Sequence, residues 1–311
     1  RSKVLLSDVK EMIVGDSGRY KSVSLRAEII RVQAMRTFFV HFCLVAASRA
    51  LPFDAFNARI LEGASDAPVT HESFNELAEK ALNTSELIFG GHFARPGLLP
   101  MQAFIIWTNG KTGSLHQCGG TLISLNHILT AAHCAVDLIA PSRVMLGAVT
   151  YNANTTNTQW REIRGVYVHP NYDDKDEDVY NDIAVLEFKS PVELNHVNGN
   201  QRVSSTELRY ADVKLFSLMA CRRLRPKDNV SGNQICAGSK GRGAGKGDSG
   251  GPLQVIHNHT IYELGIASYA SAVPDIIQNH QDEKPTVFTR VSQYCDYIAR
   301  VTKDAAKCKK I

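Results

Sequence analysis

The chain has 311 residues, of which 44% are hydrophobic and 21% are charged, and its formal net charge is +4. This length and apolar content suit one large or two small folded domains. Because the net charge is slight and basic and acidic residues are interspersed, neither a nucleic acid nor an anionic membrane surface is expected as a partner.

Residues 35–50 have the pattern of a secretory signal peptide: a basic start at Met35-Arg36, a short apolar run and a small-residue end. The run is far shorter than the ~20 residues that a membrane-spanning helix needs, so no stable membrane anchor is expected. A buried core helix is the alternative interpretation. Because a secretory signal should begin the protein, we expect translation to start at Met35 and residues 1–34 to be a non-native upstream extension.

The cysteine count agrees with secretion. Seven cysteines are an odd number for a secreted protein, but removal of the signal peptide also removes Cys43 and leaves six. Sequons for N-glycosylation begin at Asn83, Asn154, Asn229 and Asn258. We therefore expect a secreted, extracellular glycoprotein with disulfide bonds.

The pattern of apolar and polar residues changes near Ala103. Residues 51–87 are polar and contain one helical pattern, with Thr70 as its N-cap. After Ala103, short apolar runs alternate with turn residues, and two of these runs flank Asn258 as in a hairpin. Many short strands at regular spacing predict an all-β sandwich or barrel. A helical pattern returns only in residues 293–303.

Three segments carry residue types suited to nucleophilic catalysis. Residues 129–134 place His133 at the end of an apolar strand, and residues 181–186 place Asp182 at the start of another. The run Gly-Asp-Ser-Gly-Gly-Pro places Ser249 among glycines. A serine is a poor nucleophile unless a histidine base and an orienting carboxylate activate it. Flexible glycines also allow the N–H groups of Gly247 and Ser249 to form an oxyanion hole.

In these motifs and in the order His133, Asp182, Ser249, residues 88–311 resemble a chymotrypsin/trypsin-like serine protease. The resemblance implies an all-β fold of two antiparallel six-stranded β-barrels, with the catalytic cleft between them and a short C-terminal helix. It also implies the catalytic roles. Ser249 attacks the scissile carbonyl, His133 takes and later returns the proton, and Asp182 holds the tautomer of His133.

The resemblance also implies how the six cysteines pair. One bridge lies beside the catalytic histidine, a second flanks the loop before the specificity pocket, and the remaining two cysteines pair across the C-terminal tail. These pairs are Cys118 with Cys134, Cys221 with Cys236, and Cys295 with Cys308.

No cofactor and no metal are expected. The positions at which some trypsins bind calcium hold Ala148, Thr155 and Thr158, whereas a hard cation needs several carboxylate or carbonyl oxygens. The serine mechanism requires no metal.

Residues 88–91, Ile-Phe-Gly-Gly, resemble the start of a mature protease of this family. Cleavage there frees the α-amine of Ile88, which pairs with Asp248 and orders the specificity pocket and the oxyanion hole. Residues 51–87 are then a propeptide. The chain departs from the family because Glu-Leu, rather than Arg or Lys, precedes the cut. A trypsin-like activator should not cut there, so we expect either an activating protease that prefers large apolar residues or processing at another position.

The specificity pocket also departs from that of a trypsin. Gly243 stands where trypsin-like members carry the aspartate that selects Arg or Lys, and Gly245 stands where the family has a bridging cysteine. Side chains at Ala270 and Thr286 replace glycines and narrow the pocket, which favours small or medium apolar residues before the scissile bond. The pocket as a whole comprises Gly243, Lys246, Ser268, Tyr269, Ala270 and Thr286.

These observations predict a secreted serine endopeptidase that is made as a zymogen. Its partners are protein or peptide substrates, an activating protease and protein inhibitors. The alternative is a catalytically silent homologue that serves as an extracellular binding module. The unusual activation site and the missing bridge favour that alternative, and the intact triad with Gly247 opposes it.

Overall fold

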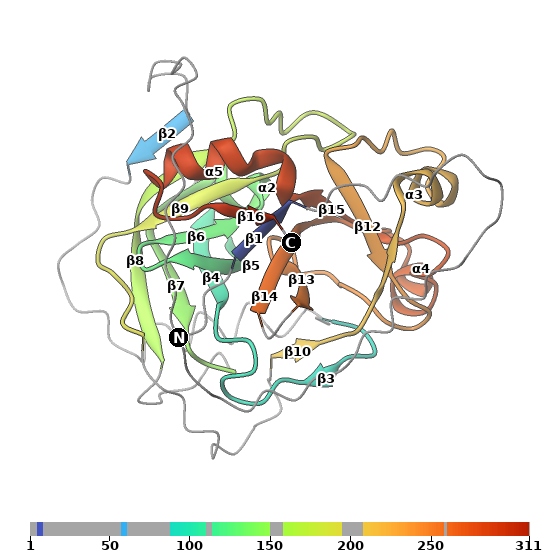
Figure 1. Cartoon of the computed structure of the whole chain (residues 1–311), viewed down its shortest axis with the longest axis horizontal. Coiled ribbons are helices and arrows are strands. Elements are labelled where there is room, and N and C mark those ends of the chain that lie inside the picture. The colour runs from blue at the N-terminus through green and yellow to red at the C-terminus, as the bar shows by residue number, and fades with distance from the viewer. Residues whose placement is uncertain are drawn as a thin grey trace.

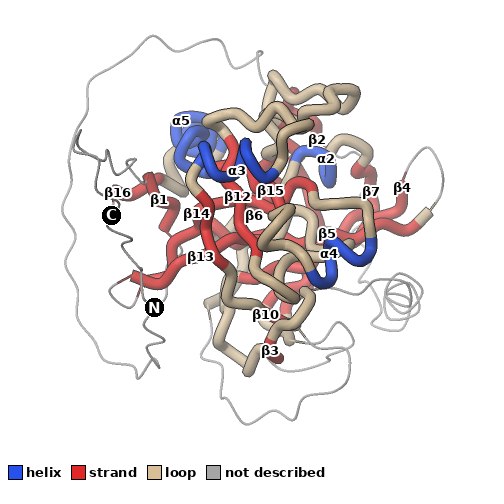
Figure 2. Tube along the Cα trace, turned by 90° about the vertical axis from the view of Figure 1, so that its right-hand side faces the viewer, coloured by secondary structure: helices blue, strands red, loops and turns tan. Residues whose placement is uncertain are grey.

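The computed structural model describes residues 5–8, 57–60, 88–109, 114–149, 158–194, 208–257 and 260–310. Within them the regular structure is mostly β, and the helices are few and short (Figures 1 and 2). The predicted all-β class is therefore confirmed. The expected signal peptide and the helical pattern after Thr70 lie outside the described residues.

The first barrel has six antiparallel strands and closes on itself (Figure 1, green and yellow-green). The strand order is β8-β7-β4-β5-β6-β9, and β9 pairs again with β8. A short upstream strand, β2 (Asn57–Ile60), also pairs antiparallel with β8. The barrel strands are β4 (Gln102–Asn109), β5 (Leu115–Ser124), β6 (His127–Thr130), β7 (Leu138–Leu146), β8 (Gln159–Val168) and β9 (Ala184–Phe188).

The second sheet has seven strands in the order β11-β12-β15-β14-β1-β16, and β13 pairs with β14. It forms a half-barrel that does not close among the described residues. With the closed barrel it makes the predicted two-barrel fold, but its β1 strand, parallel to both neighbours, was not expected. Its members are β1 (Leu5–Asp8), β11 (Lys214–Phe216), β12 (Gln234–Gly238), β13 (Pro252–His257), β14 (Thr260–Tyr269), β15 (Thr286–Arg290) and β16 (Cys308–Lys310).

Short elements cover the two halves. A small sheet joins β3 (His92–Phe93) to β10 (Arg209–Tyr210). The predicted C-terminal helix begins as a 3-10 turn before it becomes α-helical. In the part of the chain that the structure describes, no helix is long and apolar enough to cross a membrane. The helical elements are α2 (Ala132–Ala135), α3 (Leu218–Leu224), α4 (Pro274–Asn279), η2 (Val291–Tyr294) and α5 (Cys295–Val301).

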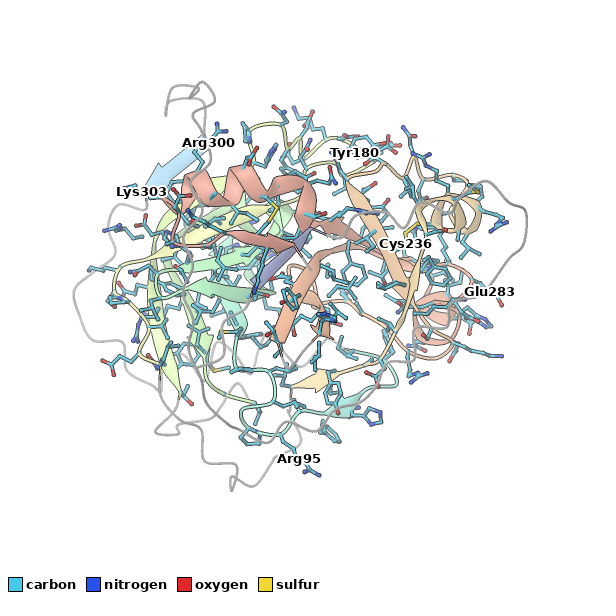
Figure 3. The ribbon with its side chains drawn as sticks, viewed as in Figure 1. Arg95, Tyr180, Cys236, Glu283, Arg300 and Lys303 are labelled. Carbon is cyan, nitrogen blue, oxygen red and sulfur yellow. A yellow bond between two sulfur atoms is a disulfide. The ribbon has the colours of Figure 1, made fainter. Side chains whose placement is uncertain are left out.

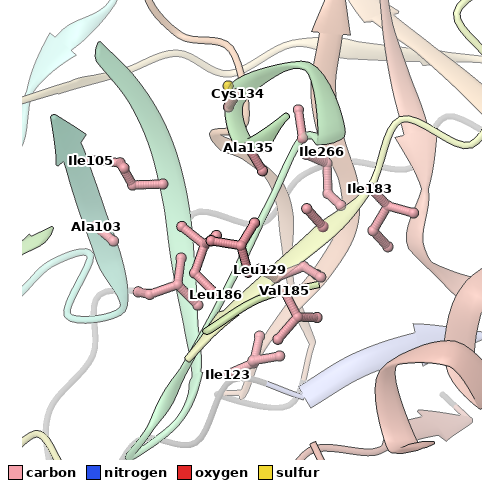
Figure 4. Packing of buried hydrophobic residues seen from close by; sticks show 14 of the residues in the cluster. Ala103, Ile105, Ile123, Leu129, Cys134, Ala135, Ile183, Val185, Leu186 and Ile266 are labelled. Carbon is pink, nitrogen blue, oxygen red and sulfur yellow. The ribbon is translucent and has the colours of Figure 1, made fainter. Parts of the chain in front are cut away.

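The main hydrophobic core fills the first barrel and continues beneath α5. Ile105 from β4, Leu129 from β6 and Leu186 from β9 are fully buried and converge in the interior (Figure 4). Ile298 from α5 and Ile266 from β14 belong to the same cluster. Because one apolar cluster includes residues from both halves, burial of that surface holds the two halves and the C-terminal helix together.

Three disulfides join the same cysteine pairs that the resemblance implies. Cys118–Cys134 ties β5 to α2, Cys221–Cys236 ties α3 to β12, and Cys295–Cys308 ties α5 to β16. Each closes a loop of 13 to 16 residues. Loops of this size contribute about 3 kcal/mol each in the chain-entropy account. The first of these bridges fixes the turn that carries His133.

Replacing a core leucine tests whether the barrel interior carries this stability. Leu186→Ala leaves a cavity at a fully buried site, so we expect a loss of about 2–5 kcal/mol in the free energy of unfolding. Leu194→Ala is the matched control, because Leu194 is 61% exposed and should change that free energy by less than about 0.5 kcal/mol. Urea unfolding curves measure both, and equal effects would contradict the assignment of the core.

Candidate active site

His133 and Asp182 are joined by two hydrogen bonds. The Nδ1 atom of His133 donates to Oδ2 of Asp182 over 2.8 Å, and the backbone N–H of His133 donates to Oδ1 over 2.9 Å. A carboxylate can only accept, so the proton of the neutral imidazole lies on Nδ1 and its Nε2 is left as an acceptor. This is the tautomer that a general base requires.

Local backbone geometry turns Asp182 inward. The preceding Asn181 has a φ of +56°, a left-handed conformation that asparagine tolerates better than most residues. Its side chain donates to the Asn171 carbonyl over 2.9 Å and accepts from the Tyr294 hydroxyl over 3.1 Å. Asp182 itself is fully buried.

Two residues of the second sheet also donate hydrogen bonds to Asp182. The hydroxyl of Ser268, on β14, donates to Oδ2 of Asp182 over 2.5 Å. The hydroxyl of Thr289, on β15, donates to the backbone carbonyl of Asp182 over 2.8 Å. The sequence predicts Ser268 only as a residue of the pocket and carries no signal for Thr289. Both contacts join positions more than 80 residues apart in the chain, and no local pattern marks them.

The pair shifts both pKa values toward the charged forms. Burial lowers the pKa of His133, but the Asp182 carboxylate and its hydrogen bond outweigh burial, so the pKa of His133 is raised. Burial raises the pKa of Asp182, but the charge and hydrogen bonds of His133 and the hydroxyl of Ser268 lower it overall. Asp182 is therefore ionised at neutral pH and can stabilise an imidazolium at His133.

Backbone contacts hold the Ser249 loop beside the His133 turn. The N–H of Gly119 donates to the Ser249 carbonyl over 2.7 Å, and Gly119 follows the bridged Cys118. Gly250, with a φ of +75°, packs so closely that a Cβ there would lie 2.2 Å from Oγ1 of Thr130. The N–H of Gly250 also donates to the Ala267 carbonyl over 2.8 Å. Only glycine fits at this contact, so the loop that carries Ser249 is fixed between β14 and the end of β6.

The backbone around Ser249 leaves two donors without acceptors. Gly247 has a φ of +101°, which a side chain would disfavour. Over the described ranges, neither the N–H of Gly247 nor that of Ser249 donates a hydrogen bond, whereas the N–H of Asp248 between them donates to the Gly245 carbonyl. Unpaired N–H groups on both sides of one residue are the donors that an oxyanion hole needs.

The segment after Ile88 and the carboxylate of Asp248 both contact the loop of residues 243–245 in the uncut chain. Phe89 and Gly243 form an antiparallel bridge in which the N–H of Phe89 donates to the Gly243 carbonyl over 2.9 Å. The carboxylate of Asp248 accepts from the Gly245 N–H over 2.7 Å. Burial raises the pKa of Asp248 to about 7, against a small lowering by that hydrogen bond. No cationic side chain in the described ranges pairs with it.

The predicted pocket residues lie in different environments. Gly243 and Thr286 are buried, and the Thr286 hydroxyl donates to the side chain of Gln281, which sequence analysis did not single out. The ring of Tyr269 is half-buried beneath the guanidinium of Arg225, 5.1 Å from the ring centre. The remaining members are the half-buried Ala270, the buried Ser268 and the exposed Lys246.

One group of potential metal ligands, Cys118, His133 and Cys134, lies within the described residues. Its two cysteines are joined in a disulfide and offer no thiolate. This set therefore does not suit a metal ion.

Comparisons with known proteins agree on one family. Residues 88–199 and 195–298 match the family model described as Trypsin. The serine protease snk of Drosophila melanogaster is 30% identical over 257 residues, which cover 69% of this chain and 57% of snk. Chymotrypsin-like elastase family member 1 of Canis lupus familiaris is 30% identical over 246 residues, or 70% of this chain and 93% of that protein.

A third relative is phenoloxidase-activating factor 3 of Holotrichia diomphalia. It is 30% identical over 268 residues, which cover 72% of this chain and 74% of the relative. The chain thus spans little more than half the length of snk but nearly the whole of the elastase.

The coupling between His133 and Asp182 can be measured directly. In Asp182→Asn, loss of the negative charge should lower the pKa of His133 by about one unit or more. Titration of the imidazole Cε1–H by NMR gives this pKa. Asp174→Asn, in the exposed loop before Asp182, is the control and should leave it unchanged. An unchanged pKa in Asp182→Asn would contradict the pairing.

Proposed function

Because this chain belongs to the trypsin family of serine proteases, we propose that it is an endopeptidase that cleaves peptide bonds through Ser249, His133 and Asp182. The observation that carries the proposal is the pair of hydrogen bonds from His133 to the buried Asp182, which leaves Nε2 of His133 as an acceptor on a turn held beside the Ser249 loop. Secretion is part of the proposal. It is supported by the signal-peptide pattern and by three disulfides, which persist in oxidising compartments.

The proposed reaction has two steps. Ser249 Oγ attacks the scissile carbonyl while its proton passes to Nε2 of His133, and the N–H groups of Gly247 and Ser249 bind the resulting oxyanion. His133 then protonates the leaving amine, which leaves an acyl ester on Ser249. A water molecule attacks this ester, His133 accepts its proton, and the proton returns to Ser249 as the acid product departs. No cofactor takes part.

We further propose that cleavage between Leu87 and Ile88 activates the protease. In the uncut chain, burial raises the pKa of the Asp248 carboxyl to about 7, so a cationic partner would stabilise its ionised form. The bridge between Phe89 and Gly243 already holds the segment after Ile88 against the pocket loop. A new α-amine at Ile88 would supply that cation.

The preferred substrates in this proposal carry a small or medium apolar residue before the scissile bond. The absence of a carboxylate at Gly243 removes the charge that would select Arg or Lys, and the side chains of Ala270 and Thr286 narrow the walls. The protein substrates, the activating protease and any protein inhibitors are partners of this same cleft.

Labelling with a fluorophosphonate probe tests the enzyme against the silent homologue. An activated Ser249 attacks the phosphorus and expels fluoride, so the cut chain should label and Ser249→Ala should not. Ser114→Ala is the matched control. The Ser114 hydroxyl also contacts a histidine, Nε2 of His116 over 3.0 Å, but both residues are exposed, and no carboxylate among the described residues pairs with His116. If the cut wild type does not label, the binding-module alternative is favoured.

Asp182→Asn should lower kcat by about 10⁴ at neutral pH, the loss that belongs to the Ser-His-Asp triad of this family and is carried over here. The physical reason is that an amide at this position favours the wrong tautomer of His133. Steady-state kinetics on a peptide substrate measure the effect. A loss smaller than tenfold would argue that Asp182 does not act on His133 during catalysis.

Sequencing the N-terminus of the secreted protein tests the activation cut. We expect the mature form to begin at Ile88. In Leu87→Asp, a protease that prefers large apolar residues loses its site, so the uncut form should accumulate. A mature form that begins elsewhere would refute this cut while leaving the labelling prediction intact.

A further inference from the structure

A buried glutamine lies among the residues of the predicted pocket. Gln281 belongs to a polar stretch between α4 and β15, where sequence patterns suggest an exposed loop, yet only 1% of its surface is exposed. Its near neighbour Glu283 instead lies at the outer edge of the molecule (Figure 3). A fully buried amide in a surface loop is costly unless each polar atom finds a partner.

The backbone on each side of Gln281 is fixed against the loop that leads to Gly243. The N–H of Gly241 donates to the carbonyl of Asn279 over 3.0 Å, and Lys240 forms an antiparallel bridge with His280. Gly238 approaches so closely that a Cβ there would lie 2.5 Å from the carbonyl oxygen of Gln281. These contacts leave the side chain of Gln281 directed toward the interior.

Every polar atom of the Gln281 side chain is satisfied. Its Nε2 donates to the carbonyls of Ala244 and Ile277, each over 2.8 Å, and its Oε1 accepts from the Thr286 hydroxyl over 2.9 Å. The bond to Ile277 also satisfies a carbonyl in the last turn of α4. Three short bonds in three directions lock the rotamer and remove most of the desolvation cost.

The amide fills the space directly beside Gly243. A Cβ at Gly243 would lie 2.0 Å from Oε1 and 2.4 Å from Cδ of Gln281, so even a methyl group is excluded. The same amide contacts Ala244, which follows Gly243, and Thr286, which forms the wall. The amide therefore lies between Gly243, where a trypsin-like enzyme would carry a carboxylate, and Thr286, where an open pocket would have glycine.

We propose that the carboxamide of Gln281 forms the floor of the specificity pocket and limits its depth to small apolar residues before the scissile bond. This inference rests on the proposed protease function and names the residue that sets its substrate class. Gly243 and Thr286 then shape the pocket partly by accommodating this amide, whereas the side chain of Lys246 is exposed.

The amide also holds the pocket together. The segments 239–245 and 270–285 contain no cysteine, so no covalent bridge can join them. The bond from Gln281 to Ala244 and the bridge between Lys240 and His280 link these two segments without a disulfide. One residue thus closes the pocket and limits its depth.

The test compares substrates that differ only in the residue before the scissile bond. The full chain, with an enteropeptidase sequence inserted before Ile88 and cut before assay, is given succinyl-Ala-Ala-Pro-X 4-nitroanilides in which X is alanine, valine, leucine or phenylalanine. The quantity measured is kcat/KM for leucine divided by kcat/KM for alanine. Fluorophosphonate labelling is measured in parallel on each protein.

Gln281→Ala removes the floor and should raise this ratio at least tenfold, since each methylene that an apolar pocket accommodates is worth about tenfold or more. Gln281→Asn keeps the amide but shortens the side chain by one methylene and should raise the ratio less. Gln278→Ala, the same residue type exposed on α4, is the control and should leave the ratio unchanged.

Three results would overturn the proposal. If Gln281→Ala labels at the wild-type rate and its ratio stays within about threefold of wild type, Gln281 is structural only. If Gln281→Ala does not fold, Gln281→Asn decides by the same ratio, and an unchanged value overturns the proposal. A wild type that neither labels nor cleaves refutes the proposed function itself, and the pocket proposal with it.

Discussion

The arrangement of the site depends on the hydrogen bonds that the buried carboxylate of Asp182 accepts. Asp182 lies two residues before β9 of the first barrel and accepts two hydrogen bonds from His133 and one from Ser268, which belongs to the second half. An ionised carboxylate with no access to water is tolerated only when its oxygens are paired, so loss of any partner destabilises the site. The same group thus orients the imidazole and ties the two halves together. The stability of the site and the proposed catalysis therefore both depend on the hydrogen bonds to Asp182.

The loop that carries Ser249 is held in a different way, by close packing of backbone on backbone. Gly250 lies against Thr130 and Gly119, in the interior next to a disulfide, and no side chain would fit there. The proposed pocket is held in a third way, by the fully hydrogen-bonded amide of Gln281. Charge, steric exclusion and a neutral hydrogen-bond network each fix a different part of the site.

The sequence predicted those parts of the structure that depend on local motifs. Short apolar runs predicted the all-β class. The motifs around His133, Asp182 and Ser249 predicted the candidate catalytic residues, which lie on segments that the fold brings near one another. The hydrogen bond from Ser268 to Asp182 and the burial of Gln281 arise from segments far apart in the chain, and a polar residue in a polar stretch carries no sign of burial. The 3-10 start of the C-terminal helix and the pairing of β1 with β14 and β16 were likewise beyond local patterns, because tertiary contacts decide them.

In the proposed mechanism Ser249 is a nucleophile that is activated by His133, and the N–H groups of Gly247 and Ser249 stabilise the oxyanion. A crystal structure of the cut protein with a peptide boronic acid ending in the alanine analogue tests it most directly, because tetrahedral boronates mimic the transition state of acyl transfer. The account predicts a covalent bond from Ser249 Oγ to boron, with one boronate oxygen within hydrogen-bond distance of both N–H groups. A saturated crystal with boron bonded elsewhere, or with no boron at Ser249, would contradict it.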